Sequence, residues 1–146
     1  MSKRPDSSIS RICDANFNRA KEGLRVCEEV ARFVLNSRAL TEEFKQARHS
    51  LDGLLRRLIK PEEAISCRNS GGDVGKTVYG RELSRGSIND IFFANIQRVK
   101  ESIRVLEEFS KLARPKAALG FKDLRYDIYA LEKKTAVAIA ALRHSR

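Results

Sequence analysis

A polar motif occurs twice in this chain and limits the folds that the chain can adopt. Residues 16–29 and 95–108 carry the same residue at eight of fourteen positions, at an offset of 79. Seven of these shared positions are Asn16/Asn95, Arg19/Arg98, Glu22/Glu101, Arg25/Arg104, Val26/Val105, Glu28/Glu107 and Glu29/Glu108. Because most of these residues are polar rather than Ala or Leu, composition alone does not explain the match. We interpret the chain as a duplicated unit.

Each copy of the motif lies in a long segment whose apolar residues recur every three or four positions, which is the period of an α-helix. Helices are predicted from about residue 8 to 36, from 41 to 60, from 88 to 114 and from 116 to 142. The second and fourth helices also match each other, because Phe44-Lys45 and Arg48 correspond to Phe121-Lys122 and Arg125. The repeated unit is therefore predicted to be a two-helix hairpin.

Two such hairpins, packed about a pseudo-twofold axis, give an all-α four-helix bundle. We predict one domain over residues 1–146, with the first repeat at about 8–60 and the second at about 88–143. Residues 61–87 lose the helical period and contain five of the eight glycines, so we expect a connecting loop with a short helix near Pro61–Ile65. Connections of this length are often functional.

Composition narrows the environment and the partners. The chain has no apolar run long enough to span a membrane and no apolar N-terminal segment, so we expect a cytoplasmic protein without a membrane partner. Its net charge of +10 favours anionic partners, which include nucleic acids, nucleotides and phosphorylated metabolites. Cys13, Cys27 and Cys67 have no zinc-site spacing, and we expect them to be small core residues.

Two regions are candidates for a site. On a helical wheel, Asn16 and Asn95, together with Arg19 and Arg98, are best placed to line a groove between helices. Duplicated Asn is informative because a helix interior gains nothing from Asn. The alternative is that the Arg and Glu residues of the motif form surface ion pairs of small energy.

The glycine-rich stretch 70–77 is the second candidate region. It resembles a phosphate-binding P-loop, but Ser70 replaces the first glycine and no strand is predicted before it. Arg68, Asp73 and Lys76 could still hold a phosphate group with the free N–H groups of the loop, although a plain flexible connector is the alternative. His49 is a lone helical histidine, which is more often a surface residue than a catalyst.

Several motifs together resemble a small all-helical family of thiamine biosynthesis, whose members occur alone or fused ahead of a thiamine-phosphate synthase barrel. The motifs are Arg11-Ile-x-Asp14-Ala-Asn16-x-Asn18-Arg19-Ala-x-Glu22-Gly23-Leu-Arg25-Val-x-Glu28-Glu29, Arg48-His49, Asp73-Val-Gly75 and Ala94-Asn95-x-x-Arg98-x-x-Glu101-x-x-Arg104-x-Leu-Glu107-Glu108. The resemblance implies a kinase that phosphorylates hydroxymethylpyrimidine phosphate to its diphosphate with ATP and Mg²⁺. The small phosphorylated pyrimidine is then the expected partner.

The resemblance also implies roles for residues of this chain. Arg19, Arg98 and Asp73 are the implied catalytic residues, with Asp73 also the Mg²⁺ ligand. The implied substrate and phosphate contacts are Arg11, Asn16, Asn95, Glu22, Glu101, Arg48, His49, Arg68 and Gly75. Arg68-Asn69-Ser70 departs from the Arg-Asp-Thr that the family pattern leads us to expect before Asp-Val-Gly, so a metal role of that acid passes to Asp73.

Two other functions stay open on the sequence alone. One is a non-catalytic helical interaction or regulatory domain related to thiamine-phosphate synthase. The other is a basic helical module that binds nucleic acid, but Glu is interleaved with Arg in both copies of the motif, so we expect no nucleic-acid partner. Residues 136–141 are apolar all round, which leaves a homo-oligomer as one arrangement.

Overall fold

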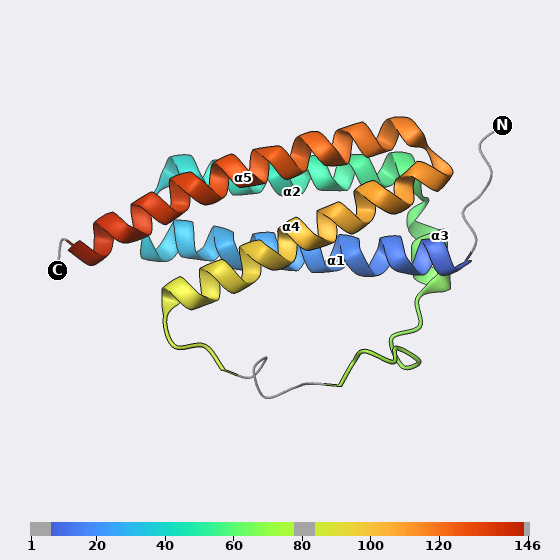
Figure 1. The fold of residues 1–146 in the computed structure, drawn as a ribbon, viewed down its shortest axis with the longest axis horizontal. Helices are drawn as coiled ribbons and strands as arrows, with labels where there is room; N and C mark the ends of the chain where they lie inside the picture. Colours follow the sequence, from blue (N-terminus) through green and yellow to red (C-terminus); the bar gives the residue numbers. More distant parts are fainter. Residues whose placement is uncertain (1–6, 78–83, 145–146) are drawn as a thin grey trace.

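The computed structural model describes residues 7–77 and 84–144, which form helices and their connections (Figure 1). The elements are α1 (Ser7–Glu29), the π-helical turn η1 (Val30–Val34), α2 (Arg38–Leu58), α3 (Pro61–Cys67), α4 (Ile88–Ala113) and α5 (Pro115–His144). No strand occurs in this described part of the chain, so the all-α prediction is confirmed. Residues 78–83 of the predicted loop lie outside the described residues.

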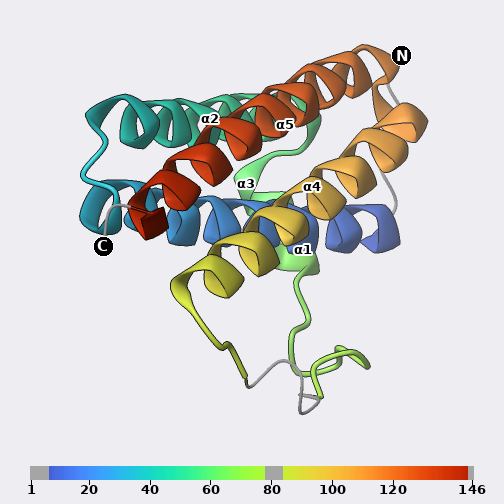
Figure 2. The ribbon, with the colours of Figure 1, turned by 60° about the vertical axis from the view of Figure 1, so that its left-hand side comes forward.

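The four long helices pack side by side, as Figures 1 and 2 show. The α1 helix packs on both α2 and α4, and α5 packs on the same two helices from the other side. The core between them contains Phe44 of α2, Phe92 of α4 and Phe121 of α5, none of which is exposed. The short helix α3 packs against α1 near the end of α2, where its Ala64 forms a small apolar cluster with Leu55 of α2 and Phe17 of α1.

The connection between α1 and α2 is a tight turn. Asn36 adopts a left-handed conformation with a φ of 50°, and the backbone N–H of Ser37 bonds to the carbonyl of Ala31 at 3.0 Å. The Ser37 hydroxyl then caps α2 by accepting the backbone N–H of Leu40 at 3.1 Å. The second helix therefore starts at residue 38 rather than at the predicted Thr41, whose hydroxyl bonds back to the Ser37 carbonyl.

The second half of the repeated motif forms buried ion pairs between helices. Glu28 is buried, and Arg48 of α2 donates to both of its carboxylate oxygens at 2.8 and 3.2 Å. In the second repeat, the Nε group of Arg125 on α5 donates to one carboxylate oxygen of the buried Glu107 at 3.1 Å. One more arginine, three residues earlier on the same helix, reaches each glutamate: Arg25 for Glu28 and Arg104 for Glu107. These contacts tie the helices of each hairpin together and follow the pseudo-twofold pattern.

The C-terminal half of α5 is not buried all round, contrary to the sequence-based expectation. Ile139 is only 5% exposed and belongs to the core, whereas Val137 is 63% exposed. One face of this segment thus completes the bundle and the other faces outward. No helix in the described ranges is both long enough and apolar enough to cross a membrane.

Candidate functional site

A polar cleft of about 690 Å³ lies between the N-terminal half of α1 and the segment that follows α3. One wall consists of α1 side chains that recur every three or four residues and therefore share a face of the helix. The polar members of this wall are Ser8, Arg11, Asp14, Asn16, Asn18, Arg19 and Glu22. The other wall consists of Arg68, Asn69, Ser70 and Asp73. The cleft thus joins the first copy of the motif to the beginning of the glycine-rich segment.

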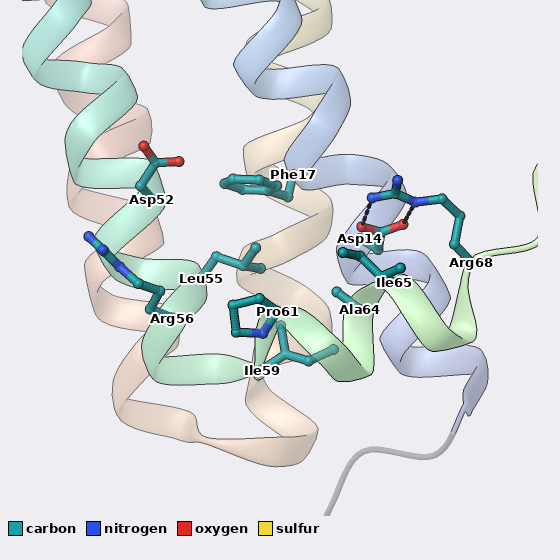
Figure 3. A pocket seen from close by; sticks show the side chains of 10 residues that line it. All are labelled: Asp14, Phe17, Asp52, Leu55, Arg56, Ile59, Pro61, Ala64, Ile65 and Arg68. Carbon is teal, nitrogen blue, oxygen red and sulfur yellow. Dashed lines mark hydrogen bonds and ion pairs between the residues drawn. The ribbon is translucent and has the colours of Figure 1, made fainter.

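An ion pair between Asp14 and Arg68 connects the two walls (Figure 3). The Nε and Nη2 groups of Arg68 donate to the two carboxylate oxygens of Asp14, both at 2.8 Å, and Asn18 donates to one of them at 3.1 Å. Asp14 is only 5% exposed. Its hydrogen bonds and its negative charge raise the pKa of the Arg68 guanidinium above its ordinary value. The pair holds the end of α3, which Arg68 caps, against α1.

Two other arginines face the cleft with most of their hydrogen-bonding capacity unused. Arg11 is exposed and makes no hydrogen bond or ion pair with the described residues. Arg19 is also exposed, and its one hydrogen bond is a long contact of 3.5 Å to the side-chain oxygen of Asn16. Asn16 is buried and donates to the Ile12 carbonyl at 2.9 Å. The cleft therefore offers a ligand two exposed guanidinium groups, eight residues or about 12 Å apart along α1.

The glycine-rich segment uses its own polar groups to hold its shape. The Asp73 carboxylate accepts the Gly75 N–H at 2.8 Å, and the Asn69 side chain accepts the Gly72 N–H at 2.9 Å. The Lys76 ammonium donates to the Gly71 carbonyl at 2.9 Å. Neither Gly75 nor Lys76 lines the cleft. The segment resembles a P-loop in sequence but not in structure, because the N–H groups of Gly72 and Gly75 donate to side-chain oxygens of the segment itself.

The acidic groups do not fit a metal site held by the protein. Among residues 7–77 and 84–144, no three His, Cys, Asp or Glu side chains come close enough together to hold a metal ion. Asp14 is engaged by Arg68 and Asn18, and Asp73 by Gly75. The predicted Mg²⁺ role of Asp73 thus has no structural partner among the described residues, and no step through a metal is derived.

The predicted contacts from the second copy of the motif do not line this cleft. Asn95, Arg98 and Glu101 all lie on α4, whereas only α1 and the segment after α3 line it. The Asn95 carbonyl lies against Gly23, where an added Cβ would approach it to 3.0 Å. Gly23 is seven residues, or about 10 Å, along α1 from Asn16. The bundle therefore separates the two asparagines that sequence reasoning brought together.

Arg48 and His49, which sequence reasoning placed at the phosphate, also lie elsewhere. Arg48 is engaged by Glu28, which is twelve residues, or about 18 Å, along α1 from Asn16. His49 is exposed on α2 and does not line the cleft. Arg48 thus forms an ion pair with a buried glutamate of the bundle, as does its counterpart Arg125.

Asp14 and Asn18 are site residues that sequence reasoning did not select. The sequence does contain a signal for Asp14, because it stands between the core residue Cys13 and the half-buried Phe17 on α1. A carboxylate on the buried side of a helix requires a cationic partner. No spacing rule identifies Arg68, 54 residues later, as that partner.

A family model and several curated proteins both match this chain. The model of the ThiD2 family matches residues 11–134. A protein named thiamine-phosphate synthase from Synechocystis sp. is 41% identical over 133 residues, which is 90% of this chain and 37% of that protein. The protein of that name from Rhodopirellula baltica is 38% identical over 143 residues, which is 97% of this chain and 38% of that protein. The protein of that name from Nostoc punctiforme is 42% identical over 125 residues, 85% of this chain and 34% of that protein. The chain thus spans about a third of the length of these curated relatives. No solved structure matches it with significance.

These comparisons overturn the predicted reaction. The relatives carry the name thiamine-phosphate synthase and not hydroxymethylpyrimidine-phosphate kinase, so the kinase prediction is wrong. Their names give no support to ATP as a co-substrate either. The thiamine-biosynthesis part of the prediction is confirmed. A helical domain related to thiamine-phosphate synthase agrees better with these relatives than a kinase does.

Proposed function

Because the chain belongs to the ThiD2 family, we propose that it is a ligand-binding helical module of thiamine-phosphate synthesis that holds a small phosphorylated pyrimidine in the cleft beside α1. The observation that carries this proposal is the pair of exposed arginines, Arg11 and Arg19, on one wall of the cleft. Guanidinium groups with spare N–H donors bind the oxygens of a phosphate group in a well-defined geometry.

The charges around the cleft favour an anion in spite of its acidic residues. Asp14 is neutralised by Arg68, and Asp73 accepts a backbone hydrogen bond from its own loop. Glu22 lies at the far end of the α1 wall, eleven residues from Arg11 and three residues from Arg19. A phosphate group between Arg11 and Arg19 thus meets two positive charges. Among the described residues, the only hydrogen bond that these two side chains make is the long one from Arg19 to Asn16.

The size of the chain supports a role as one module of a larger activity. It corresponds to about a third of relatives named for the synthesis of thiamine phosphate. In this proposal the bond-forming chemistry belongs to a synthase catalytic domain, and the helical module binds a phosphorylated pyrimidine for it. The engagement of Asp14 and Asp73 in structural bonds supports binding rather than proton transfer at the cleft.

Isothermal titration calorimetry with hydroxymethylpyrimidine phosphate tests the proposal. We expect binding to the wild-type chain, and a loss of at least tenfold in affinity in Arg11→Gln and Arg19→Gln, which is about 1.4 kcal/mol. Arg98→Gln is the matched comparison, because Arg98 occupies the same position in the second copy of the motif and is also exposed. An equal loss of affinity in Arg98→Gln would indicate that the ligand does not bind in this cleft. The absence of any binding by wild type would refute the proposal.

A second experiment tests the link to the synthase. The chain is added to a thiamine-phosphate synthase catalytic domain, and the formation of thiamine phosphate is followed at a limiting concentration of the pyrimidine substrate. We expect a higher rate with the wild-type chain than with Arg19→Gln. Identical rates with and without the chain would restrict its role to binding alone.

A further inference from the structure

A second cavity of about 300 Å³ lies beside the cleft, between α1, the C-terminal end of α2 and α3 (Figure 3). Its wall is mainly apolar and is formed by Phe17, Leu55, Ile59, Pro61, Ala64 and Ile65. Asp14 and Arg68 line both this cavity and the polar cleft. One ion pair therefore separates an apolar compartment from a polar one.

The dimensions and the lining of the apolar cavity fit a flat ring. Its volume is at the lower end of the range of small-molecule sites, about 300 to 1,000 Å³. Phe17 provides an aromatic surface, which Figure 3 shows between the α2 and α3 side chains of the wall. The ammonium of Lys21 lies 5.4 Å from the centre of this ring and 2.9 Å from Asp52, so Phe17 is held from outside the cavity wall.

A carboxylate at the α2 side of the cavity gives it a chemical preference. Asp52 uses its Oδ1 oxygen for Lys21, which leaves Oδ2 to accept a hydrogen bond. Arg56, one turn later on α2, is exposed, and Figure 3 shows its guanidinium directed away from Phe17 and Leu55. The open oxygen of Asp52 matches the amino group of an amino-substituted nitrogen heterocycle.

We infer that the two cavities form one site for a ligand with two parts, in which an amino-substituted heteroaromatic ring occupies the apolar cavity and its phosphate group lies in the cleft across the Asp14–Arg68 pair. This inference rests on the proposed function and assigns the compartment that selects the ring. Arg68 donates to Asp14 through Nε and Nη2, so its Nη1 group stays available for the phosphate. Asp14 is a positioning residue, since it holds the guanidinium at the boundary.

The repeat shows that this arrangement belongs to one half of the molecule. At the offset of 79, the positions of Arg11, Asp14 and Phe17 are taken by Asp90, Phe93 and Ile96. Ile96 is fully buried in the core, and Asp90 accepts the backbone N–H of Gly86. The second copy thus lacks the cation, the carboxylate and the ring-facing aromatic, and a single ring site is expected per chain.

Blocking the mouth of the apolar cavity tests this inference. Ile65 lines the cavity but is 63% exposed, so Ile65→Trp adds bulk at its mouth without disturbing the core. The matched control is Leu119→Trp on α5, where the leucine is 64% exposed and lines neither cavity. The probes for calorimetry are hydroxymethylpyrimidine phosphate and inorganic phosphate.

We expect Ile65→Trp to weaken hydroxymethylpyrimidine phosphate at least tenfold and to leave inorganic phosphate unchanged, while Leu119→Trp alters neither. Asp52→Asn, which keeps the shape of the side chain, should also weaken only the ring-bearing ligand. Wild-type affinity of both Ile65→Trp and Asp52→Asn for the ring-bearing ligand would overturn the inference, and so would an equal loss for both probes. If wild type binds neither probe, the proposed function itself fails, which is a distinguishable result.

Discussion

Replacing Arg48 by Met separates a structural role of this arginine from the phosphate-binding role that its sequence context implies. Arg48 is 14% exposed and its partner Glu28 is 4% exposed, so the substitution leaves a buried carboxylate with Arg25 as its remaining cation, at 3.3 Å. Removing one partner of a buried ion pair costs about 3 to 5 kcal/mol. Because Arg25 remains, we expect a loss near the lower limit, about 3 kcal/mol.

The expected loss corresponds to a large shift in melting temperature. With about 2.1 cal/mol/K of unfolding entropy per residue, a 146-residue chain loses roughly 10 °C in Tm for 3 kcal/mol. Urea denaturation followed by circular dichroism measures the free energy of unfolding directly. Arg125→Met should show a similar loss, because Arg125 is 13% exposed and holds a glutamate that is 5% exposed. Arg57→Met, at an exposed position of α2, should stay within about 0.5 kcal/mol of wild type.

The double variant Glu28→Leu/Arg48→Met completes the test, because removing both charges should recover most of the lost stability. Binding of hydroxymethylpyrimidine phosphate by folded Arg48→Met should be unchanged, since Arg48 does not line the cleft. The reasoning is refuted if Arg48→Met is as stable as wild type but loses ligand affinity, which is the result that a phosphate-binding arginine gives.

Two further predictions concern packing and thiols. Gly23→Ala should lower the free energy of unfolding by about 1 to 3 kcal/mol, because an added Cβ lies 2.7 Å from Val99 and 3.0 Å from a backbone oxygen. At Gly53 an added Cβ meets nothing within 4 Å, so Gly53→Ala should raise the free energy of unfolding by up to about 1 kcal/mol. Urea denaturation measures both changes, and equal effects would contradict this packing. Burial raises the pKa of Cys13 to about 11 and, with a smaller contribution from a nearby glutamate, that of Cys27 to about 12, so only Cys67 should react rapidly with a thiol reagent at pH 8. The two thiols ionise near pH 9 in the unfolded chain, but in the folded chain the pKa is about 11 for Cys13 and about 12 for Cys27. Between pH 9 and these values, each thiol should lower the stability by about 1.4 kcal/mol per pH unit, and this dependence should be shallower in Cys13→Ala.

The fold was accessible from sequence because its signals are local and repeated. The apolar period located the four long helices, and the short helix expected near Pro61 is α3. The helix expected from residue 88 begins there, with the Ser87 hydroxyl accepting the Asp90 N–H. The start of α2 was predicted late because Thr41 followed by acids resembles a cap. The effective cap is Ser37, which follows a left-handed residue that no propensity identifies.

The site was only partly predictable because it depends on which helices touch and at what height. Arg11, Asn16, Arg19, Glu22, Arg68 and Asp73 were selected from sequence and do line one cleft. Their roles as catalytic or binding residues stay predictions. Asn95, Arg98 and Glu101 were added by symmetry, but antiparallel packing of α1 and α4 places Asn95 opposite Gly23 rather than Asn16. Sequence identity between repeats predicts equal environments only where the duplicated partners are also present.

Duplication explains why one motif carries both scaffold and site. Glu28 pairs with Arg48 in the first half and Glu107 pairs with Arg125 in the second, so this part of the motif has the same structural role in both repeats. At the N-terminal end of the motif the halves differ, because α1 packs against α3 and lines the cleft with the segment after it, whereas α4 does not line this cleft. Asp14 is paired inside the protein because Arg68, at the end of α3, reaches it, whereas Phe93 is the corresponding residue in the second repeat. The single connection between the repeats thus turns a symmetric frame into a protein with one asymmetric cleft.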